Sequence, residues 1–597
     1  MRLSIMFFAT LTQCSALLLT QYVTDGILLR EATLYDPLLS KYSVIILDEA
    51  HERNLNSDTL LGILKKIRAR RQDLRIIICS ATIDAESFLK FFGVQDSPLK
   101  KSRWGPKPDQ GGDVATSSAP HHQEHVGRGT IISVDGRQYP VDVLFLQTAA
   151  PNYLEATVET CSKIHQYESA GDVLCFLPTG EDVDTAIRLA EDMFEEHLTQ
   201  CEFLPLYGTL PQNVQKRVFA PRTDKSRRRF IFATNIAETS VTVPNISFVV
   251  DSGLVKMPYF DPVTSLQRLI VHETSKASAI QRSGRAGRIR PGKCFRLYTE
   301  KFFESMKEHT PPEILRTDLT SFLLTLKVLG VDNILAFDLM DLPPVGALAH
   351  GLETLYALGA INDDTVVTDI GRDLATFPTE PRVARMLLES LRQGCAWEVL
   401  GVAGALQVRD LWHRPPDRRP QQILDYQEAL AEFADPSGDH VTFCNLLSAM
   451  DDQHWNEADC RQRFLNYMAL RKALEVRRQL VNSLRAFGSV KAMGIMDGTG
   501  KERSEAIRRC VTAGFFGNVA KLNNDGRYYT LRKSVLVTPS SQSIFNSHGG
   551  VSGTEYIIFG ETIDGKRGGI ELKIVSKIHS QWLREFAPDY FVPSTAP

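Results

Sequence analysis

The chain has 597 residues, of which 43% are hydrophobic and 23% are charged, and its formal net charge is −3. This composition is that of ordinary globular protein and excludes collagen-like and wholly disordered chains. The length exceeds what one hydrophobic core can serve and predicts about three to five domains. The near-neutral charge is compatible with nucleic-acid binding, because acidic faces elsewhere can offset a basic groove.

The cysteines and residues 1–20 give information on the cellular compartment of the protein. Ten cysteines occur singly, without a CxxC pair. This spacing argues against a zinc site or a disulfide scaffold and favours a reducing intracellular compartment. Residues 1–20 contain one early Arg and a short apolar run, which is compatible with a signal peptide but too short and interrupted for a membrane span. The rest of the chain argues against secretion, and we expect no membrane association.

The first third of the chain alternates strand and helix patterns. Residues 44–47 and 76–78 are continuous apolar runs, and residues 58–70 between them have helical spacing of leucine and isoleucine. Strand, helix and strand in this order predict a parallel sheet covered on both faces. Residues 95–130 are rich in Pro, Gly, Ser and His, and we interpret them as a disordered surface insertion. Three histidines within it (His121, His122 and His125) could suggest a metal site, but a solvated loop is the favoured interpretation.

Three further patterns follow. Residues 171–180, 228–240 and 247–253 predict a second parallel sheet. From about residue 300 to residue 485 the pattern is that of short helices with apolar stripes that pack a core. The last hundred residues are strand-like and predict a small barrel.

The first candidate for chemistry is the sequence DEAH at 48–51, directly after the strand predicted at 44–47. An Asp can hold Mg²⁺ directly or through water, and the adjacent Glu can orient and deprotonate a water that attacks a phosphate. The alternative is a solvated acidic loop. The catalytic interpretation gains from other motifs in a fixed order: TDG at 24–26, SAT at 80–82, TNIAETS at 234–240 and QRSGRAGR at 281–288.

The last of these motifs has three arginines at a spacing of three, interrupted by glycine. Such a pattern is unusual for a solvated face. Guanidinium groups present planar, multidentate positive charge to a polyphosphate. An arginine that reaches the terminal phosphate from a neighbouring domain acts as an arginine finger.

Together these motifs resemble those of the DEAH-box RNA helicases of superfamily 2, above all the group that includes splicing and ribosome-biogenesis helicases. The resemblance extends from about Gln21 to Phe591, apart from residues 95–130. It implies an α/β chain with two RecA-like parallel-sheet domains, the first incomplete, followed by a winged helix, a helical ratchet domain and an OB-fold barrel. The domains expected are residues 1–147, 148–300, 301–370, 371–490 and 505–592.

The resemblance also implies roles for the nucleotide site. Asp48 and Glu49 would serve Mg²⁺ and the attacking water, and Gln281 would help to position that water. Arg285 and Arg288 would be the fingers on the terminal phosphate. The remaining nucleotide-linked positions are His51, Ser80 and Thr82, which would couple nucleotide state to the interdomain contacts, and Ser240 and Thr242, which would sense the terminal phosphate.

Other residues are expected to stack on the base of ATP or to bind RNA. Phe219 resembles the aromatic residue that stacks on the base of ATP, although an ordinary place in a helix core is the alternative. Thr24, Thr234 and Asn235 match positions that touch RNA. RNA would be held mainly through its backbone and hence largely without sequence preference. Residues 250–273 fit a β-hairpin that wedges between strands, and its Tyr259–Phe260 pair could stack on a base or pack the hairpin.

The sequence departs from the family at the phosphate-binding loop. A loop of the form GxxxxGK[ST] is absent upstream of Thr24, and the one glycine-rich candidate, at 498–501, has Glu502 in place of the hydroxyl residue. We interpret that segment as a decoy in a linker. The simplest explanation is an incomplete chain that holds about half of the nucleotide pocket. The alternative is an ATPase-deficient scaffold that binds RNA or a protein partner.

The predicted function is that of an ATP-dependent RNA helicase that translocates on single-stranded RNA and remodels RNA–protein complexes, with pre-mRNA splicing as the expected process. ATP and Mg²⁺ are the expected cofactors. The resemblance implies RNA as a partner, a G-patch protein as a possible activator, and a nuclear location.

Overall fold

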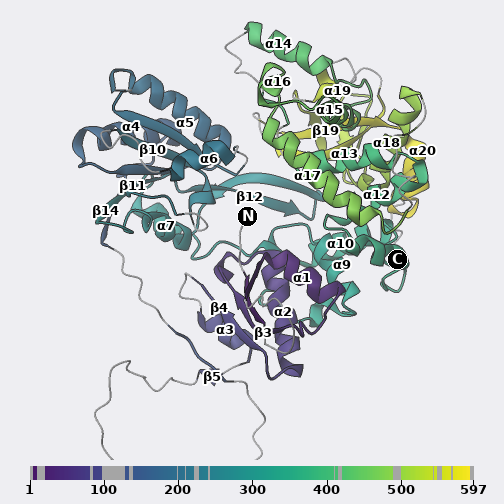
Figure 1. The fold of residues 1–597 in the computed structure, drawn as a ribbon, viewed down its shortest axis with the longest axis horizontal. Coiled ribbons are helices and arrows are strands. Elements are labelled where there is room, and N and C mark those ends of the chain that lie inside the picture. The colour runs from purple at the N-terminus through teal and green to yellow at the C-terminus, as the bar shows by residue number, and fades with distance from the viewer. Residues whose placement is uncertain are drawn as a thin grey trace, which may run out of the picture. The chain divides into compact units, whose positions relative to one another are not determined.

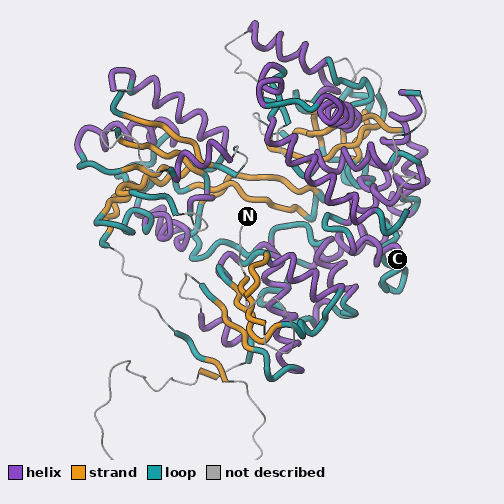
Figure 2. The backbone as a smooth tube through the Cα atoms, viewed as in Figure 1, coloured by secondary structure: helices purple, strands orange, loops and turns teal. Residues whose placement is uncertain are grey.

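The computed structural model forms two units, each described here by itself: residues 1–138 with 337–341, and residues 139–336 with 342–597. Figure 1 shows the elements and Figure 2 the course of the backbone. None of the helices in the described part of the chain is long and apolar enough to cross a membrane. The residues described are 5–9, 20–80, 85–93, 95–96, 128–132, 139–197, 199–208, 210, 212–220, 227–238, 242–408, 411–413, 420–488, 496, 499–541, 543–547, 554–565 and 569–591.

The first unit contains a four-stranded sheet in the order β2-β1-β3-β4. Strands β3 and β4 are parallel, as predicted, but β1 is antiparallel to both β2 and β3. The sequence analysis did not anticipate β1, a short run of strand-favouring residues that pairs over four residues or more with each neighbour. The elements are β1 (Ile5–Ala9), β2 (Thr20–Val23), α1 (Asp25–Leu34), β3 (Tyr42–Leu47), η1 (Ala50–Glu52), α2 (Leu55–Arg70), β4 (Arg75–Ile78), α3 (Ala85–Phe91), β5 (Gln95–Asp96) and β6 (Arg128–Gly129).

Helix α2 is the main helix of this unit, and its sequence explains where it begins and which face it buries. Asn54 is the N-cap, and its side chain accepts the Ser57 N–H at 2.8 Å, which satisfies one of the exposed donors of the first turn. The predicted apolar stripe is buried: Leu60, Leu61, Leu64 and Ile67. The predicted insertion at 95–130 lies outside the described residues except at its two ends.

The second unit begins with a RecA-like sheet of six strands in the order β7-β14-β11-β8-β10-β9, and every pairing in it is parallel. The second predicted parallel sheet is thus confirmed. Strand β7 lies before residue 147 and was therefore predicted to belong to the first domain. It pairs instead with β14 in this sheet, a long-range pairing without a local sequence signal. The elements are β7 (Val141–Phe145), α4 (Tyr153–Tyr167), β8 (Asp172–Phe176), α5 (Gly180–Met193), β9 (Cys201–Leu206), α6 (Gln212–Phe219), β10 (Arg228–Ala233), η3 (Asn235–Ala237), β11 (Ile246–Asp251), α7 (Lys276–Ser283) and β14 (Gly292–Arg296).

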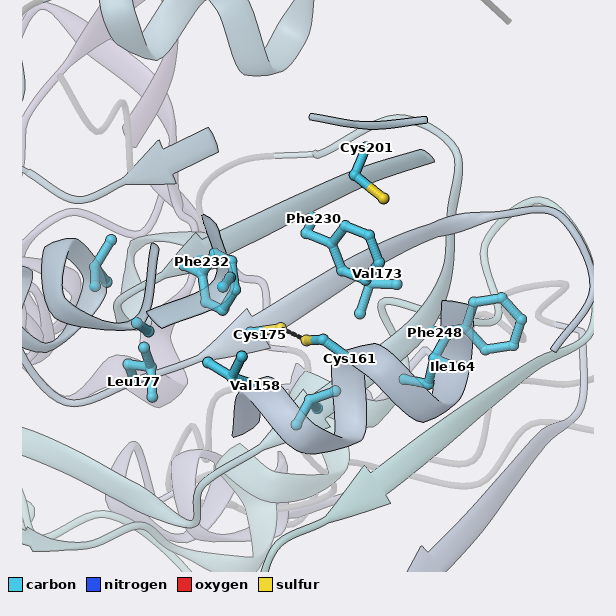
Figure 3. Close-up of a cluster of buried hydrophobic side chains, with 14 of the residues drawn as sticks. Val158, Cys161, Ile164, Val173, Cys175, Leu177, Cys201, Phe230, Phe232 and Phe248 are labelled. Atoms are coloured by element: carbon cyan, nitrogen blue, oxygen red, sulfur yellow. Dashed lines mark hydrogen bonds between the residues drawn. The ribbon is translucent and has the colours of Figure 1, made fainter. Parts of the chain in front are cut away.

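Helices α4 and α5 cover one face of this sheet and α6 packs on the other. Figure 3 shows the core under α4, where Cys161 faces Cys175 of β8 with the two sulfur atoms 3.3 Å apart. Both are free thiols. Burial raises the pKa of Cys175 well above its usual range, so this thiol stays protonated and packs as a small apolar group.

A long β-hairpin, β12 (Leu254–Asp261) and β13 (Leu266–Glu273), leaves this sheet and confirms the hairpin expected at 250–273. Its tip is joined to the C-terminal barrel: Thr562 Oγ1 donates to the Gln267 carbonyl at 2.7 Å, and Arg268 pairs with Asp564 at 3.3 Å. Phe260 is buried and its ring lies 4.9 Å from the His350 ring.

The two aromatic residues of the hairpin therefore differ. Phe260 packs the hairpin against a neighbouring helix, whereas Tyr259 is 41% exposed. Only Tyr259 presents a ring to solvent that could meet a base.

The remaining residues form helices and a closed five-stranded barrel in the order β15-β16-β17-β19-β18. The helix-rich stretch and the C-terminal barrel are thus as predicted. The elements are α8 (Glu300–Ser305), η4 (Glu313–Leu315), α9 (Thr320–Val328), η5 (Ile334–Ala336), α10 (Val345–Ala357), α11 (Asp369–Thr376), α12 (Pro381–Gln393), α13 (Ala396–Leu406), α14 (Pro420–Ala431), α15 (Asp439–Gln453), α16 (Glu457–Gln462), α17 (Tyr467–Leu484), α18 (Gly500–Phe515), β15 (Val519–Leu522), β16 (Tyr528–Thr530), β17 (Leu536–Pro539), α19 (Ile544–Ser547), β18 (Tyr556–Asp564), β19 (Ile570–Ile578), α20 (Ser580–Phe586) and η7 (Asp589–Phe591).

The start of α15 holds two buried titratable residues against the barrel. Asp439 accepts the Ser543 hydroxyl at 2.6 Å and the Val575 N–H at 2.7 Å, and burial raises its pKa to about 6 despite these hydrogen bonds. His440 Nδ1 lies 2.9 Å from Ser576 Oγ, and burial lowers the pKa of this imidazole to about 3. The two groups thus have opposite effects on the pH dependence of stability.

The imidazole of His440 should make the fold sensitive to acid. Between about pH 6.5 and pH 3 the unfolded chain binds a proton that the folded chain excludes, so stability falls as the pH falls. From pH 7 to pH 5 this amounts to about 2 kcal/mol, partly offset by Asp439, whose contribution is lost as the pH rises through about 6. We expect His440→Asn to reduce the acid-dependent loss of unfolding free energy by about that amount, measured by denaturant titration at both pH values. The exposed His454→Asn is the control, and equal losses in all three proteins would contradict the prediction.

Candidate nucleotide and RNA site

In the first unit, the candidate site residues lie where β3 and β4 end. Because these strands are parallel, the DEAH segment that follows β3 and Ser80, two residues after β4, come to the same edge of the sheet. Two backbone hydrogen bonds join the two loops: the Cys79 N–H donates to the Leu47 carbonyl at 2.8 Å, and the Ala50 N–H donates to the Cys79 carbonyl at 3.0 Å. The structure therefore brings Ser80 beside the acidic motif; Thr82 lies outside the described residues.

Glu49 has a backbone conformation that few residues other than glycine adopt, with φ 53° and ψ 34°. Such a conformation costs of order 1 kcal/mol and is typical of functional turns. Asp48 Oδ1 accepts the Glu49 N–H at 3.0 Å, and Glu49 Oε2 lies 3.4 Å from His51 Nε2. The His51 side chain is 8% exposed, whereas that of Glu49 is 37% exposed. His51 thus supports the Glu49 carboxylate from the protein side and leaves it accessible from solvent.

The carboxylates fit Mg²⁺ by their chemistry. Asp48 is exposed and Glu49 is half-buried, both at the carboxyl edge of the sheet. Magnesium prefers oxygen ligands and takes only one or two carboxylates from a protein where phosphates and water supply the rest. Within the part of the chain that the structure describes, there is accordingly no cluster of three or more His, Cys, Asp or Glu residues suited to a metal.

Thr24 occupies the N-cap position of α1 at the end of β2, but its side chain makes no capping hydrogen bond. The next residue, Asp25, is buried and connects this turn to the start of α2. Its Oδ2 accepts Asn54 Nδ2 at 2.9 Å and also accepts the Ser57 hydroxyl. The predicted RNA contact at Thr24 is thus one residue away from the hydrogen-bond network that caps α2.

In the second unit, the candidate site residues are arranged around Arg282 on α7, which is 1% exposed. Its Nε donates to Glu238 Oε2 at 3.0 Å, its Nη1 donates to Asp251 Oδ1 at 2.8 Å, and its guanidinium lies 5.2 Å from the Phe176 ring centroid. Burial would lower the pKa of Arg282, but the two carboxylates outweigh this and raise it. Arg282 therefore fixes the 281–288 segment against the ends of β8 and β11 and cannot itself reach a ligand.

The other two arginines of the segment differ from Arg282 and from each other. Arg285 is buried and its Nη2 donates to the Glu238 carbonyl. Arg288 is exposed, and its Nη1 donates to Thr242 Oγ1 at 2.5 Å. Arg288 thus contacts Thr242, whereas Arg285 contacts the loop that contains Glu238. Gln281 lies half-buried on α7, and Ser240 lies outside the described residues.

The remaining predicted contacts lie at the ends of β10 and α6. Thr234 follows β10, and its N–H donates to the Leu206 carbonyl at 3.1 Å; Asn235 is exposed. Phe219 is half-buried and packs against the sheet core beneath α6. This packing agrees with the helix-core alternative, and base stacking by Phe219 stays a prediction.

The glycine-rich candidate at 498–501 was interpreted as a decoy in a linker, but its described residues, 499–501, form the start of helix α18. Thr499 is the N-cap of α18, and its Oγ1 accepts the Glu502 N–H at 3.4 Å. In return Glu502 Oε2 accepts the Thr499 N–H at 2.9 Å. This reciprocal pair is a capping box, which explains why Glu stands where a phosphate-binding loop needs a hydroxyl residue.

Sequence reasoning missed two groups of residues. Asp251, Glu238 and Arg282 form a buried ionic cluster, and an acidic residue at the end of the apolar run SFVVD was an available signal for it. Asp25 of the TDG motif and Asn54, the N-cap of α2, are 29 residues apart, and no local pattern indicates their contact.

A parallel RecA-like sheet with an arginine-rich segment, followed by helices and an OB-type barrel, defines a nucleic-acid-dependent NTPase of the helicase type. Comparison with protein families agrees, matching the helicase conserved C-terminal domain at 156–290, the winged-helix and ratchet-like parts of the helicase-associated domain at 351–379 and 380–443, and an oligonucleotide/oligosaccharide-binding fold at 507–590.

Individual relatives extend this likeness over 96% of the chain. The probable ATP-dependent RNA helicase DHX35 of Homo sapiens is 38% identical over 584 residues, which cover 77% of that protein. The DHX35 homolog of Caenorhabditis elegans is 37% identical, with 73% covered. The pre-mRNA-splicing factor ATP-dependent RNA helicase prp22 of Schizosaccharomyces pombe is 36% identical, with 45% covered. The chain belongs to the DEAH-box family of ATP-dependent RNA helicases, as its motifs predict.

Proposed function

We propose that this protein uses ATP hydrolysis to move along single-stranded RNA and to remodel RNA–protein complexes during pre-mRNA splicing in the nucleus. The observation that carries the proposal is that backbone hydrogen bonds of Cys79 and Ala50 join the DEAH loop to the loop that contains Ser80, which supports a catalytic role for the Glu49 carboxylate at this sheet edge. The link to splicing is supported by the similarity to the Schizosaccharomyces pombe pre-mRNA-splicing factor.

In the first unit, Glu49 accepts the proton of the attacking water, and Asp48 with Glu49 would hold Mg²⁺. When bound, the metal supplies positive charge to the phosphate oxygens. The left-handed backbone at Glu49 and the nearby His51 imidazole set the direction of the carboxylate. A carboxylate held in one direction by its own backbone is pre-organised for proton transfer.

In the second unit, Arg285 and Arg288 stabilise the charge that develops on the terminal phosphate, and Gln281 orients the water. Ser240 and Thr242 report the presence of that phosphate, and His51, Ser80 and Thr82 pass the change to the rest of the protein. The hydrogen bond from Arg288 to Thr242 gives this proposal a physical basis, since a phosphate that attracts Arg288 competes with the hydroxyl for the same donor.

RNA binding is assigned to Thr24, Thr234 and Asn235. Each follows the end of a strand, as residues that contact a ligand at the carboxyl edge of an α/β sheet do. Hydroxyl and amide side chains suit phosphate and sugar oxygens, which predicts binding with little sequence preference. A glycine-rich G-patch protein is the activator that family resemblance suggests.

The test is RNA-stimulated hydrolysis by protein expressed from its complete reading frame. We expect ATP turnover to rise several-fold with single-stranded RNA of any sequence, and a strand displaced from a tailed duplex only when ATP is present. A nucleotide titration under the same conditions gives ATP affinity. Tight RNA binding without ATP binding or turnover would instead establish the ATPase-deficient scaffold. Co-purification with spliceosomal RNAs from nuclear extract tests the pathway, and recovery from other RNA–protein complexes alone would contradict it.

A further inference from the structure

Five residues between η5 and α10 belong with the first unit, although both flanking segments belong to the second. We name these residues, Phe337–Asp341, the strap. The chain enters it from Ala336 and leaves it at Leu342, inside the region expected to form the winged helix. The strap itself therefore belongs with α2 in the first unit, whereas the chain on both sides of it belongs to the second unit.

The strap packs on α2 at Gly62. A Cβ atom at this position would lie 2.4 Å from the Asp338 carbonyl oxygen and 2.5 Å from the Phe337 ring. Since one of these atoms is backbone, the approach requires glycine. Two lysines of α2 flank the contact: Lys66 Nζ lies 4.4 Å from the Phe337 ring centroid, and Lys65 Nζ lies 3.0 Å from Asp338 Oδ1.

The far end of the strap meets the residue that closes the DEAH loop. Arg53 follows η1 directly and, like Glu49, has a left-handed backbone, with φ 48°. Its guanidinium makes two hydrogen bonds to Asp58, at 2.7 and 3.1 Å, and one from Nη2 to Asp341 Oδ2 at 2.5 Å. Arg53 is thus shared between α2 and the strap.

Arg53 is more buried than the cation of the strap's other ion pair. The side chains of Arg53 and Asp58 are 14% and 2% exposed, and that of Asp341 is 40% exposed. Burial would lower the pKa of Arg53, but the hydrogen bonds and charges of Asp58 and Asp341 outweigh it and raise that pKa. A charge-assisted hydrogen bond from a largely buried guanidinium is stronger than an exposed ion pair. In the second ion pair of the strap both partners are more exposed, Lys65 at 31% and Asp338 at 46%, so this pair contributes less.

We propose that the strap, through Asp341 and Arg53, is a positioning element for the DEAH loop, so that displacement of the C-terminal segments alters the hydrolysis step. The proposal rests on the proposed function of Glu49. Arg53 and Asp341 do not touch the reacting atoms. They act by fixing residues 48–53, whose two left-handed positions bracket η1. Release of Asp341 removes one of the three hydrogen bonds that the Arg53 side chain makes at the end of this loop.

The first experiment compares Asp341→Asn with the matched control Asp338→Asn, which removes the other carboxylate of the same strap. Hydrogen exchange is measured at the Glu52 and Arg53 amides, which are hydrogen-bonded within the loop. We expect at least tenfold faster exchange in Asp341→Asn and a change of less than twofold in Asp338→Asn. Asp341→Glu, which keeps the charge, should restore slow exchange in part. Unchanged exchange in Asp341→Asn would overturn the proposal without reference to ATP.

The second variant, Gly62→Ala, lifts the strap while Asp341 remains. Because Ala favours a helix over Gly by about 1 kcal/mol, any effect cannot be ascribed to a weakened α2. We expect RNA-stimulated kcat to fall about tenfold in Gly62→Ala and in Asp341→Asn with the KM for ATP unchanged. Faster exchange at the Glu52 and Arg53 amides together with a normal kcat would show that the contact orders the loop without affecting hydrolysis, and this would overturn the positioning role. A wild-type protein without turnover would refute the proposed function, while the exchange data would still decide whether the strap orders the loop.

Discussion

Arg288→Ala is expected to lower RNA-stimulated kcat by roughly a thousandfold, the lower end of what removal of an arginine finger costs. Arg288 is the exposed arginine of the 281–288 segment, and its Nη1 donates to the Thr242 hydroxyl. Movement toward a phosphate exchanges this hydrogen bond to a neutral acceptor for a stronger one to a charged acceptor. The affinity for ATP should change much less than kcat, because the finger acts on charge that develops in the transition state.

The matched control is Arg290→Ala, two residues further along. Arg290 is also exposed, but its Nε donates to Ser247 Oγ at 2.6 Å, so it serves the fold of the sheet rather than the phosphate. Turnover is measured by phosphate release at saturating ATP and RNA. A kcat for Arg288→Ala within fivefold of wild type would refute the assignment of Arg288 as a finger.

Arg285 gives a less direct test of the same idea. It is buried and donates to the Glu238 carbonyl, so truncation to Ala leaves a buried acceptor without its donor. That loss costs about 1–3 kcal/mol of stability by itself. A fall in kcat for Arg285→Ala would therefore combine structural damage with lost catalysis, which is why Arg288 is the informative position.

Much of the candidate site could be predicted from the sequence, because its motifs follow strands that are recognisable as apolar runs. The apolar run at 44–47 forms a strand that pairs in parallel with β4, and the run at 246–250 lies in a buried strand of the all-parallel second sheet; the polar residues after both runs lie at the carboxyl edge. The spacing of the three arginines indicated a polyphosphate but not which of them points inward. Only the structure separates the buried Arg282 from the exposed Arg288, since that difference depends on where Asp251 and Glu238 lie.

What the sequence could not predict depends on long-range pairing. Strand β1 joins the first sheet antiparallel to both neighbours, and β7 joins the second sheet beside β14, about 150 residues along the chain. The strap is an extreme case, because Arg53 and Asp341 are 288 positions apart. Local periodicity reports which face of an element is buried but not which distant segment covers it.

Glu49→Gln is the most direct test of hydrolysis. The substitution keeps the size of the side chain and removes the carboxylate that accepts the proton, so kcat should fall by about 10²–10⁴-fold. The left-handed turn at Glu49 and the backbone hydrogen bonds through Cys79 do not involve the carboxylate, so the loop should keep its form. Binding of ATP should persist, and the variant should trap RNA complexes that the wild type releases.

The control for this variant is Glu52→Gln, three residues further on at the end of η1, which leaves Glu49 intact. Single-turnover measurements separate the chemical step from product release, because only the former should slow in Glu49→Gln. If both variants reduced kcat equally, the effect would belong to the acidic character of the loop and not to Glu49. If Glu49→Gln alone lost turnover and still bound ATP, the carboxylate beside His51 would be the general base of the reaction.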